Sequence, residues 1–188
     1  MIDLQPFCDD ESRRFAIGAP WEKDGKHYAT DGRICIRVDV GVVATYEQHE
    51  GKHPNVDKAL ERIDRVTEWE TLEPIAVCRK CNGVGRVDLE CDNCVGSGEC
   101  ECRCETFHAC GFCDGKGKIN SMCPACEKPV RLMGRNIRTH YAWLMSQLPG
   151  VEIGAERMVK ITDKTSDEDA MLCFRFSGGC GAVMPIVD

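Results

Sequence analysis

The sequence predicts an α+β fold, an antiparallel sheet with two helices, into which a cysteine-rich module is inserted. Two segments have apolar residues at helical spacing, and short alternating segments typical of strands lie before and after each of them. Eleven of the 15 cysteines lie between these two halves of the chain. We therefore expect a discontinuous α+β domain of residues 1–75 and 129–188 and a cysteine-rich module of residues 76–128.

The first half of the α+β domain is expected to contain a hairpin, a further strand and a helix. The hairpin pairs residues 15–19 with residues 27–30 around the turn sequence Lys23-Asp24-Gly25. Apolar and polar residues alternate over residues 34–38, which predicts a strand with one face on a core. The helix begins at Pro54 or Asn55. Its apolar face comprises Val56, Ala59, Leu60, Ile63 and Val66.

The second half is expected to contain a strand, a helix and a run of further strands. Residues 130–133 are a strand candidate, and Gly134-Arg135 is a turn. Asn136 is expected to cap a helix that ends at Pro149-Gly150. The apolar face of this helix comprises Ile137, Tyr141, Leu144, Met145 and Leu148. Later strand candidates are residues 151–153, 158–161, 171–176 and 182–187, with Gly178-Gly179 as a hairpin turn.

Four CxxC knuckles define the inserted module. They read C-R-K-C, C-D-N-C, C-G-F-C and C-P-A-C, and the first three continue as CxxCxGxG. One CxxC hairpin can direct two thiolates at a tetrahedral zinc, and two hairpins complete a four-thiolate site with no position left for a substrate. The eight cysteines therefore predict two structural zinc ions. The glycines suit a backbone that passes through positive φ to direct its amides at the sulfur atoms. They are Gly83, Gly85, Gly96, Gly98, Gly115 and Gly117.

The repeated CxxCxGxG sequence resembles the cysteine-rich domain of the DnaJ family of heat-shock co-chaperones. In that family the outer two knuckles share one zinc ion and the inner two share the other. The resemblance implies one site formed by Cys78, Cys81, Cys123 and Cys126. It implies a second site formed by Cys91, Cys94, Cys110 and Cys113. The fourth knuckle has Glu127-Lys128-Pro129 where the family has glycines, which weakens the transfer of peptide binding but not of zinc binding.

The loop between the second and third knuckles contains further candidate ligands. Cys100, Cys102, Cys104 and His108 could form a third zinc site of three cysteines and one histidine. Three sulfur atoms on five residues crowd a single ion, so two other interpretations stay open. These residues could be spare thiols in a solvated loop, or an alternative set of ligands for the second zinc. Reversible oxidation among the thiols is a further hypothesis.

Composition limits the compartment and the partners that we expect. The N-terminus has neither the basic start nor the apolar run of a secretory signal, and no segment approaches the ~18 apolar residues of a membrane span. The cysteines are therefore expected to be reduced in the cytoplasm. The formal net charge is −7; eight bound thiolates subtract eight charges and two zinc ions add four, which gives −11. This charge disfavours binding to nucleic acid.

Three short segments are similar to parts of bacterial sliding clamps, the ring-shaped processivity factors of DNA replication. They read Y-A-T-D-G-R at residues 28–33, Y-A-W-L-M-S-Q-L at residues 141–148 and A-V-M-P-I at residues 182–186. The similarity implies a clamp-like α+β domain. The chain has the length of one such domain where bacterial rings use three per subunit, so a closed ring is not implied. The layout also resembles small accessory proteins of bacteriophages.

The remaining cysteines do not suggest catalysis. Cys35, Cys173 and Cys180 lie in or beside strand patterns, where a buried cysteine behaves as a small apolar residue. No combination of nucleophile, base and oxyanion group can be assembled from the sequence, so we predict no catalytic residue.

We therefore predict a non-enzymatic zinc-binding protein that binds a protein partner. The expected partner belongs to DNA replication or recombination, or is a host machine that the protein inhibits. One alternative is a thiol–disulfide oxidoreductase or chaperone of the DnaJ cysteine-rich type. The other is a nucleic-acid-binding zinc protein.

Overall fold

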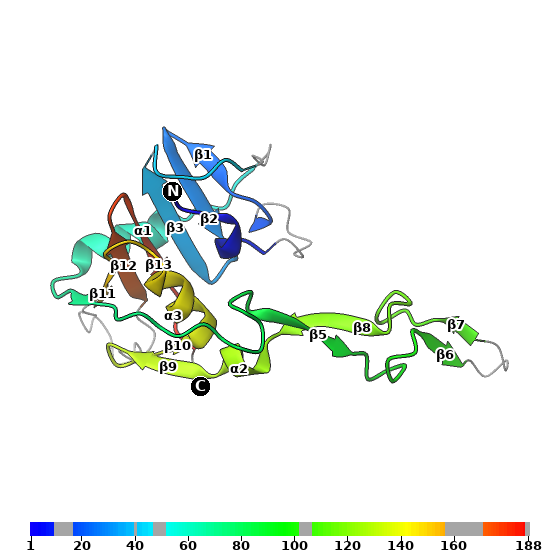
Figure 1. Ribbon diagram of the computed structural model, residues 1–188. Helices are drawn as coiled ribbons and strands as arrows, with labels where there is room; N and C mark the ends of the chain where they lie inside the picture. The colour runs from blue at the N-terminus through cyan, green and yellow to red at the C-terminus, as the bar shows by residue number, and fades with distance from the viewer. Residues whose placement is uncertain (10–16, 40, 47–51, 102–106, 157–170, 187–188) are drawn as a thin grey trace, which may run out of the picture. The chain divides into compact units, whose positions relative to one another are not determined.

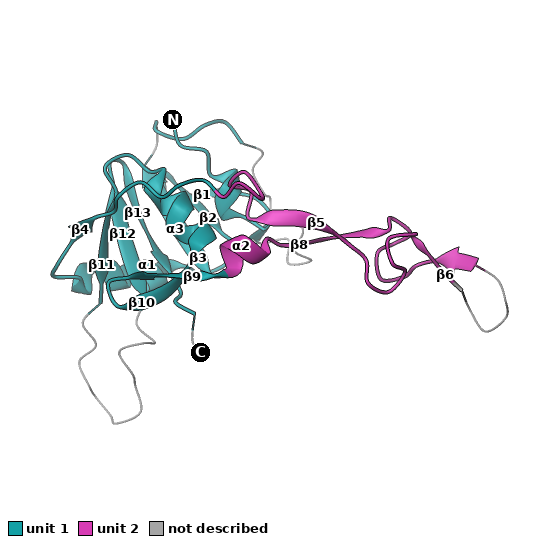
Figure 2. Ribbon diagram, turned by 60° about the horizontal axis from the view of Figure 1, so that its bottom comes forward, with its two compact units in different colours: residues 1–77, 128–188 teal, residues 78–127 magenta. Residues whose placement is uncertain are grey.

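The structure is a computed structural model of the 188-residue chain, and it describes residues 1–9, 17–39, 41–46, 52–101, 107–156 and 171–186. The chain divides into two compact units (Figure 2). Unit 1 comprises residues 1–77 and 128–188, and unit 2 comprises residues 78–127. Antiparallel sheet predominates and the α-helices are short, which agrees with the predicted α+β class.

A seven-stranded antiparallel sheet forms the centre of unit 1 (Figure 1). Its strand order is β1-β2-β3-β13-β12-β11-β4. The bounds are β1 Trp21–Lys23, β2 Lys26–Thr30, β3 Ile34–Asp39, β13 Gly179–Val183, β12 Leu172–Phe176, β11 Glu152–Ala155 and β4 Glu70–Thr71. Because β13 pairs with both β3 and β12, the two halves of the discontinuous unit share one sheet.

Both faces of this sheet are buried. On β3, Ile36 belongs to a core with α3 (Thr139–Ser146) and η1 (Gln5–Phe7), whereas its neighbour Cys35 belongs to a second core on the opposite face. The second core includes Leu60 from α1 (Asp57–Leu60), which continues as η3 (Glu61–Arg65). The prediction that residues 34–38 bury only one face is therefore wrong, because helical segments pack on both sides.

The segment predicted to begin the second helix is a strand instead. β9 (Pro129–Leu132) and β10 (Arg135–Arg138) form a hairpin in which Asn136 pairs with Arg131, so Asn136 is not a helix cap. Positive φ angles at Met133 (47°) and Gly134 (79°) make a tight two-residue turn that favours continued pairing. The helix begins only at Thr139, whose N–H and hydroxyl both donate to the carbonyl of Lys128.

Three other boundaries differ from the predictions. The partner of β2 is β1, and residues 17–19, the described part of the predicted strand 15–19, are not in a strand. The predicted helix beginning at Pro54 or Asn55 is shorter, and its second part is a 3₁₀-helix. The last strand, β13, begins and ends earlier than the predicted strand 182–187. Gly181 can belong to it because the ring of Phe174 and the carbonyl of Cys35 leave no room for a Cβ at that position. The predicted strand 158–161 lies outside the described residues.

Unit 2 consists of two ladders and a short helix. β5 (Arg86–Glu90) pairs with β8 (Lys118–Met122), and β6 (Glu99–Glu101) pairs with β7 (Phe107–Ala109). The helix α2 (Pro124–Glu127) contains the last cysteine of the fourth knuckle. The β5–β8 ladder therefore separates the outer pair of knuckles from the inner pair along the chain. No helix among the described residues of the protein is long and apolar enough to cross a membrane.

Candidate metal centres

Eight cysteines of unit 2 form two groups of four. The outer cluster consists of Cys78, Cys81, Cys123 and Cys126. The inner cluster consists of Cys91, Cys94, Cys110 and Cys113. Within each cluster the four sulfur atoms lie within 4.8 Å of one another. The β5–β8 ladder explains this grouping, because it brings the first and fourth knuckles together at one end and the second and third at the other.

The sulfur separations fit a tetrahedral metal ion. With Zn–S bonds of about 2.3 Å, two sulfur atoms of a tetrahedral site are about 3.8 Å apart. In the outer cluster the Sγ atoms of Cys81 and Cys126 are 3.4 Å apart. In the inner cluster Cys94 and Cys113 are 3.7 Å apart, and Cys91 and Cys110 are 3.9 Å apart. Each cluster therefore could hold one zinc ion by four thiolates.

Each CxxCxGxG knuckle has the same backbone conformation. The residue after the second cysteine has a positive φ in all three knuckles: 49° at Asn82, 49° at Val95 and 50° at Asp114. Both glycines of each knuckle also have positive φ. This turn brings the N–H of the second glycine 3.3 Å from the Sγ of the second cysteine. The N–H groups would stabilise negative charge on a metal-bound sulfur.

The two inner knuckles also bond to each other. The N–H of Cys91 donates to the carbonyl of Gly117 (2.9 Å), and the N–H of Cys110 donates to the carbonyl of Gly98 (2.7 Å). The backbones are so close that a Cβ on Gly98 would collide with the carbonyl oxygen of Gly115. These glycines are therefore required by close approach as well as by positive φ.

The outer cluster is less symmetric. Its fourth knuckle forms α2, in which the N–H groups of Cys126 and Glu127 donate to the carbonyl of Cys123. Without the glycines, this knuckle has no turn to direct an amide at its sulfur, and one glycine N–H to sulfur bond, from Gly85 to Cys81, is described in this cluster. Cys78 is half-buried, whereas the other seven knuckle cysteines are buried.

Hydrogen bonds and burial shift the thiol pKa values in opposite directions. The backbone amide of Cys81 is the main cause that lowers the pKa of Cys78 to about 6, and the Asn93 side chain lowers that of Cys110 to about 6. Desolvation raises the pKa of Cys113 to about 11 and that of Cys126 above its usual range. Each cluster thus combines a thiol that ionises readily with one that stays protonated until a cation binds and displaces its proton.

The predicted third site is described only in part. Cys100 is half-buried in β6, and His108 is exposed in β7, with the two Cα atoms in register. Cys102 and Cys104 lie outside the described residues. The hypothesis of a third zinc site therefore stays a prediction.

Three cysteines of unit 1 are buried in the sheet. Cys35, Cys173 and Cys180 lie on β3, β12 and β13, and desolvation is the main cause that raises the pKa of each. The pKa reaches about 12 for Cys35 and Cys173, so both are neutral thiols at pH 7. This environment suits small apolar residues rather than nucleophiles.

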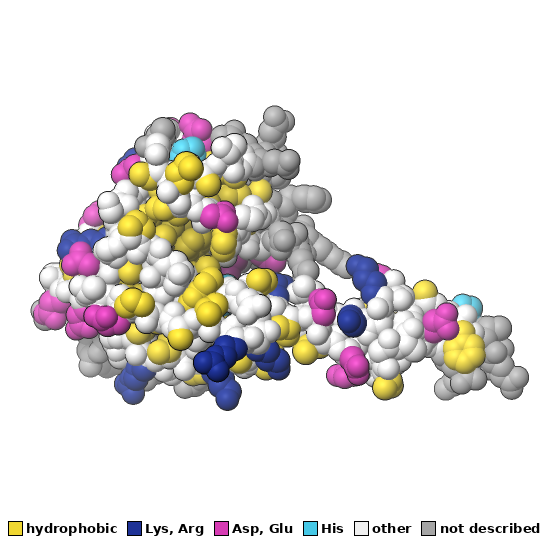
Figure 3. Space-filling model, in the orientation of Figure 1, with side chains coloured by type: hydrophobic (Ala, Val, Ile, Leu, Met, Phe, Trp, Pro, Cys, Tyr) yellow, Lys and Arg dark blue, Asp and Glu magenta, His cyan; other side chains and the backbone are white. Residues whose placement is uncertain are grey.

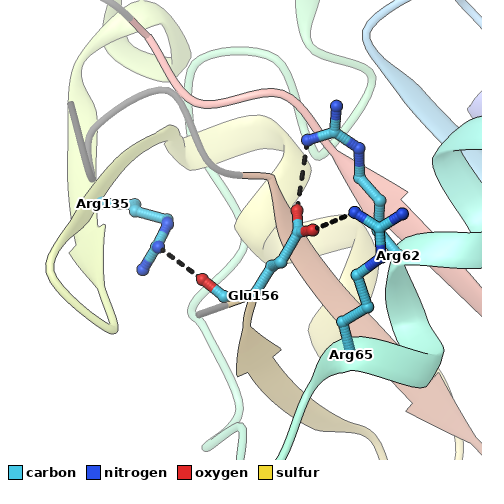
Figure 4. A network of polar contacts seen from close by, with 4 residues as sticks. All are labelled: Arg62, Arg65, Arg135 and Glu156. Atoms are coloured by element: carbon cyan, nitrogen blue, oxygen red, sulfur yellow. Dashed lines mark hydrogen bonds and ion pairs between the residues drawn. The ribbon is translucent and has the colours of Figure 1, made fainter. Parts of the chain in front are cut away.

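One buried polar network was not anticipated from the sequence (Figure 4). The carboxylate of Glu156 is only 4% exposed and forms ion pairs with Arg65 (2.8 Å) and Arg62 (3.2 Å). The guanidinium of Arg135 donates to the backbone carbonyl of Glu156. The network joins η3 to the end of β11. No sequence signal connects these residues, because 91 positions separate Glu156 from Arg65.

No family model, curated protein or solved structure matched the chain. The geometry therefore defines the class: a protein with an α+β unit and a cysteine-rich unit whose two four-cysteine clusters could hold zinc.

Proposed function

We propose that this chain is a non-enzymatic zinc-binding protein whose cysteine-rich unit binds a protein partner. The observation that carries the proposal is the pair of four-cysteine clusters, in which the distances between sulfur atoms fit tetrahedral coordination of zinc. Four thiolates complete the coordination of zinc and leave no position for a substrate, so the ions would be structural. The likeness of the knuckles to the DnaJ cysteine-rich domain supports the same assignment.

Exposed apolar side chains of unit 2 support the proposal that this unit binds a protein partner. Phenylalanine and other aromatic residues are enriched at protein–protein interfaces relative to the rest of a protein surface. Figure 3 shows hydrophobic side chains among charged ones on unit 2. The most exposed are Val84 (68%), Val95 (83%), Phe107 (66%) and Phe112 (70%). Phe112 lies between the two cysteines of the third knuckle, so a zinc ion in the inner cluster would hold its backbone rigid.

The similarity of three segments to sliding clamps supports the proposal that the partner belongs to DNA replication or recombination, or is a host machine that the protein inhibits. These segments contact one another in unit 1. The hydroxyl of Tyr141 donates to the carboxylate of Asp31 (2.6 Å), and the N–H of Met184 donates to the carbonyl of Arg33 (2.8 Å).

Metal analysis of the full chain tests the zinc assignment, and surface variants test the proposed binding of a protein partner. Elemental analysis after purification without chelator is expected to give about two zinc ions per chain. A Phe107→Ser/Phe112→Ser variant is expected to keep both ions and to lose the proteins that the wild type captures from its host. Met184→Ser, which changes an exposed apolar residue of unit 1, is the control. Loss of capture by the control alone would move the binding surface to unit 1, and a zinc content near zero would contradict the metal assignment.

A further inference from the structure

A fifth thiol, that of Cys100, lies beside the inner cluster. The Cα of Cys100 in β6 pairs with that of His108 in β7. Cys110 lies two residues after His108 and continues the register, because its N–H donates to the carbonyl of Gly98. Side chains two residues apart on a strand point to the same face. Cys100 and Cys110 are therefore diagonal neighbours on one face of the hairpin.

The side chain of Asn93 holds both sulfur atoms. Its Nδ2 lies 3.6 Å from the Sγ of Cys100 and 3.6 Å from the Sγ of Cys110. An amide NH₂ group has two hydrogens, so it can donate to both sulfurs at once. The thiol of Cys100 also donates to the backbone carbonyl of Asn93 (3.6 Å) and packs against the buried cysteines of the inner cluster. The structure thus places a fifth thiol in contact with a cluster in which four cysteines already suffice for a metal ion.

We propose that Cys100 is an exchangeable ligand of the inner zinc ion that can take the place of Cys110; this inference rests on the proposed zinc binding. In the exchange, the Cys100 thiol loses its proton and its sulfur forms a bond to zinc. The bond between zinc and Cys110 breaks, and the Cys110 sulfur takes up a proton. The ion keeps four thiolates, and the net charge of the site does not change.

The geometry favours ligand exchange over a disulfide between these two residues. Diagonal neighbours on paired strands have Cα atoms about 7–8 Å apart. A disulfide requires the two Cα atoms to be about 4.4–6.8 Å apart. Two cysteines on one zinc ion need only bring their sulfur atoms to about 3.8 Å from each other. Because Asn93 donates to both sulfurs, it can stabilise whichever of them is the bound thiolate.

Metal content of cysteine variants of the full chain tests the exchange. Cys110→Ser is expected to retain about two zinc ions, because Cys100 replaces the lost ligand, whereas Cys100→Ser/Cys110→Ser retains about one. Cys91→Ser is the matched control, because Cys91 has the same place in the second knuckle that Cys110 has in the third. It is expected to retain about one ion.

Cobalt substitution supplies a second measurement. The thiolate-to-cobalt charge-transfer absorbance of Cys110→Ser is expected to stay at the level of two four-thiolate sites, and that of Cys91→Ser to fall by about half. The outer ion is expected to be retained in every variant, which would show that the outer cluster of unit 2 has formed. One ion in Cys110→Ser with two in the wild type would overturn the exchange and leave the proposed zinc binding intact. Two ions in the double variant would overturn the assignment to Cys100, and none in the wild type would overturn both proposals.

Discussion

Units 1 and 2 are stabilised by different interactions. Unit 1 buries large apolar side chains on both faces of its sheet, among them Trp21, Ile36 and Phe174. In the described part of unit 2, every buried residue is a cysteine or a glycine. A fully buried Ile or Phe contributes about 1.5–3 kcal/mol, whereas a structural zinc site contributes about 10–16 kcal/mol to the folding of a small module. We infer that unit 1 folds through apolar burial and unit 2 through metal binding.

Removal of the metal should separate the two units and have the largest effect. We expect a strong chelator under reducing conditions to abolish amide protection throughout the β5–β8 ladder while the strands of unit 1 stay protected. Hydrogen exchange measures both in one sample. The reciprocal control replaces residues 76–128 by a Gly/Ser linker, and circular dichroism is expected to show a folded α+β unit. An unfolded deletion protein would mean that unit 1 also depends on the metal.

Loss of one outer ligand should divide unit 2 itself. Cys126→Ser is expected to lose one of two zinc ions and to lower protection near Cys78, because Cys126 and Cys78 belong to the same cluster. The inner cluster should keep its ion, since its four sulfurs come from the other two knuckles. Elemental analysis with hydrogen exchange measures this. Loss of protection around Cys91 instead of Cys78 would show that neighbouring knuckles share the ions.

Close backbone approach in the inner cluster gives a smaller and graded effect. Gly98→Ala places a Cβ against the carbonyl of Gly115 and puts a non-glycine residue at a φ of 80°. The left-handed conformation alone costs about 1–2 kcal/mol, so the zinc affinity of the inner cluster should fall at least about tenfold. The matched control is Gly111→Ala, since Gly111 has open space around its Cβ position. Competition with a chromophoric chelator measures the affinities, and equal values for the two variants would contradict the role of Gly98.

A stabilising substitution should have the smallest effect. Val95 has a φ of 49°, which disfavours a β-branched side chain, while Asn82 and Asp114 occupy the equivalent positions of the other knuckles. Val95→Asn is expected to stabilise the metal-bound inner cluster by about 1 kcal/mol. The reverse change, Asn82→Val, should destabilise the outer cluster by a similar amount. Thermal unfolding of the zinc-loaded chain measures both, and an unchanged midpoint for both variants would show that this φ stores no strain.

Local features of the fold were predictable because they depend on neighbouring residues. The turn at Lys23-Asp24-Gly25 joins β1 to β2, and Gly178 lies in the turn between β12 and β13. The CxxCxGxG motif specifies a positive-φ turn within eight residues, so each knuckle forms with the conformation that its glycines imply. The prediction that Asn136 caps a helix was wrong, because Asn136 pairs with Arg131 in a hairpin. Hairpin pairing competes with helix capping, and the sequence does not show which of the two is more stable.

By itself, the sequence determined the class of the fold, the knuckle turns and the donor atoms, all of which follow from residue type and short spacing. The tertiary structure decided what depends on distant segments. It placed β13 between β3 and β12, buried Cys35 on a second face and paired Glu156 with two arginines. It also brought Cys100 beside Cys110 through the β6–β7 register. Such contacts are set by strand pairing and packing across the whole unit, which no local pattern encodes.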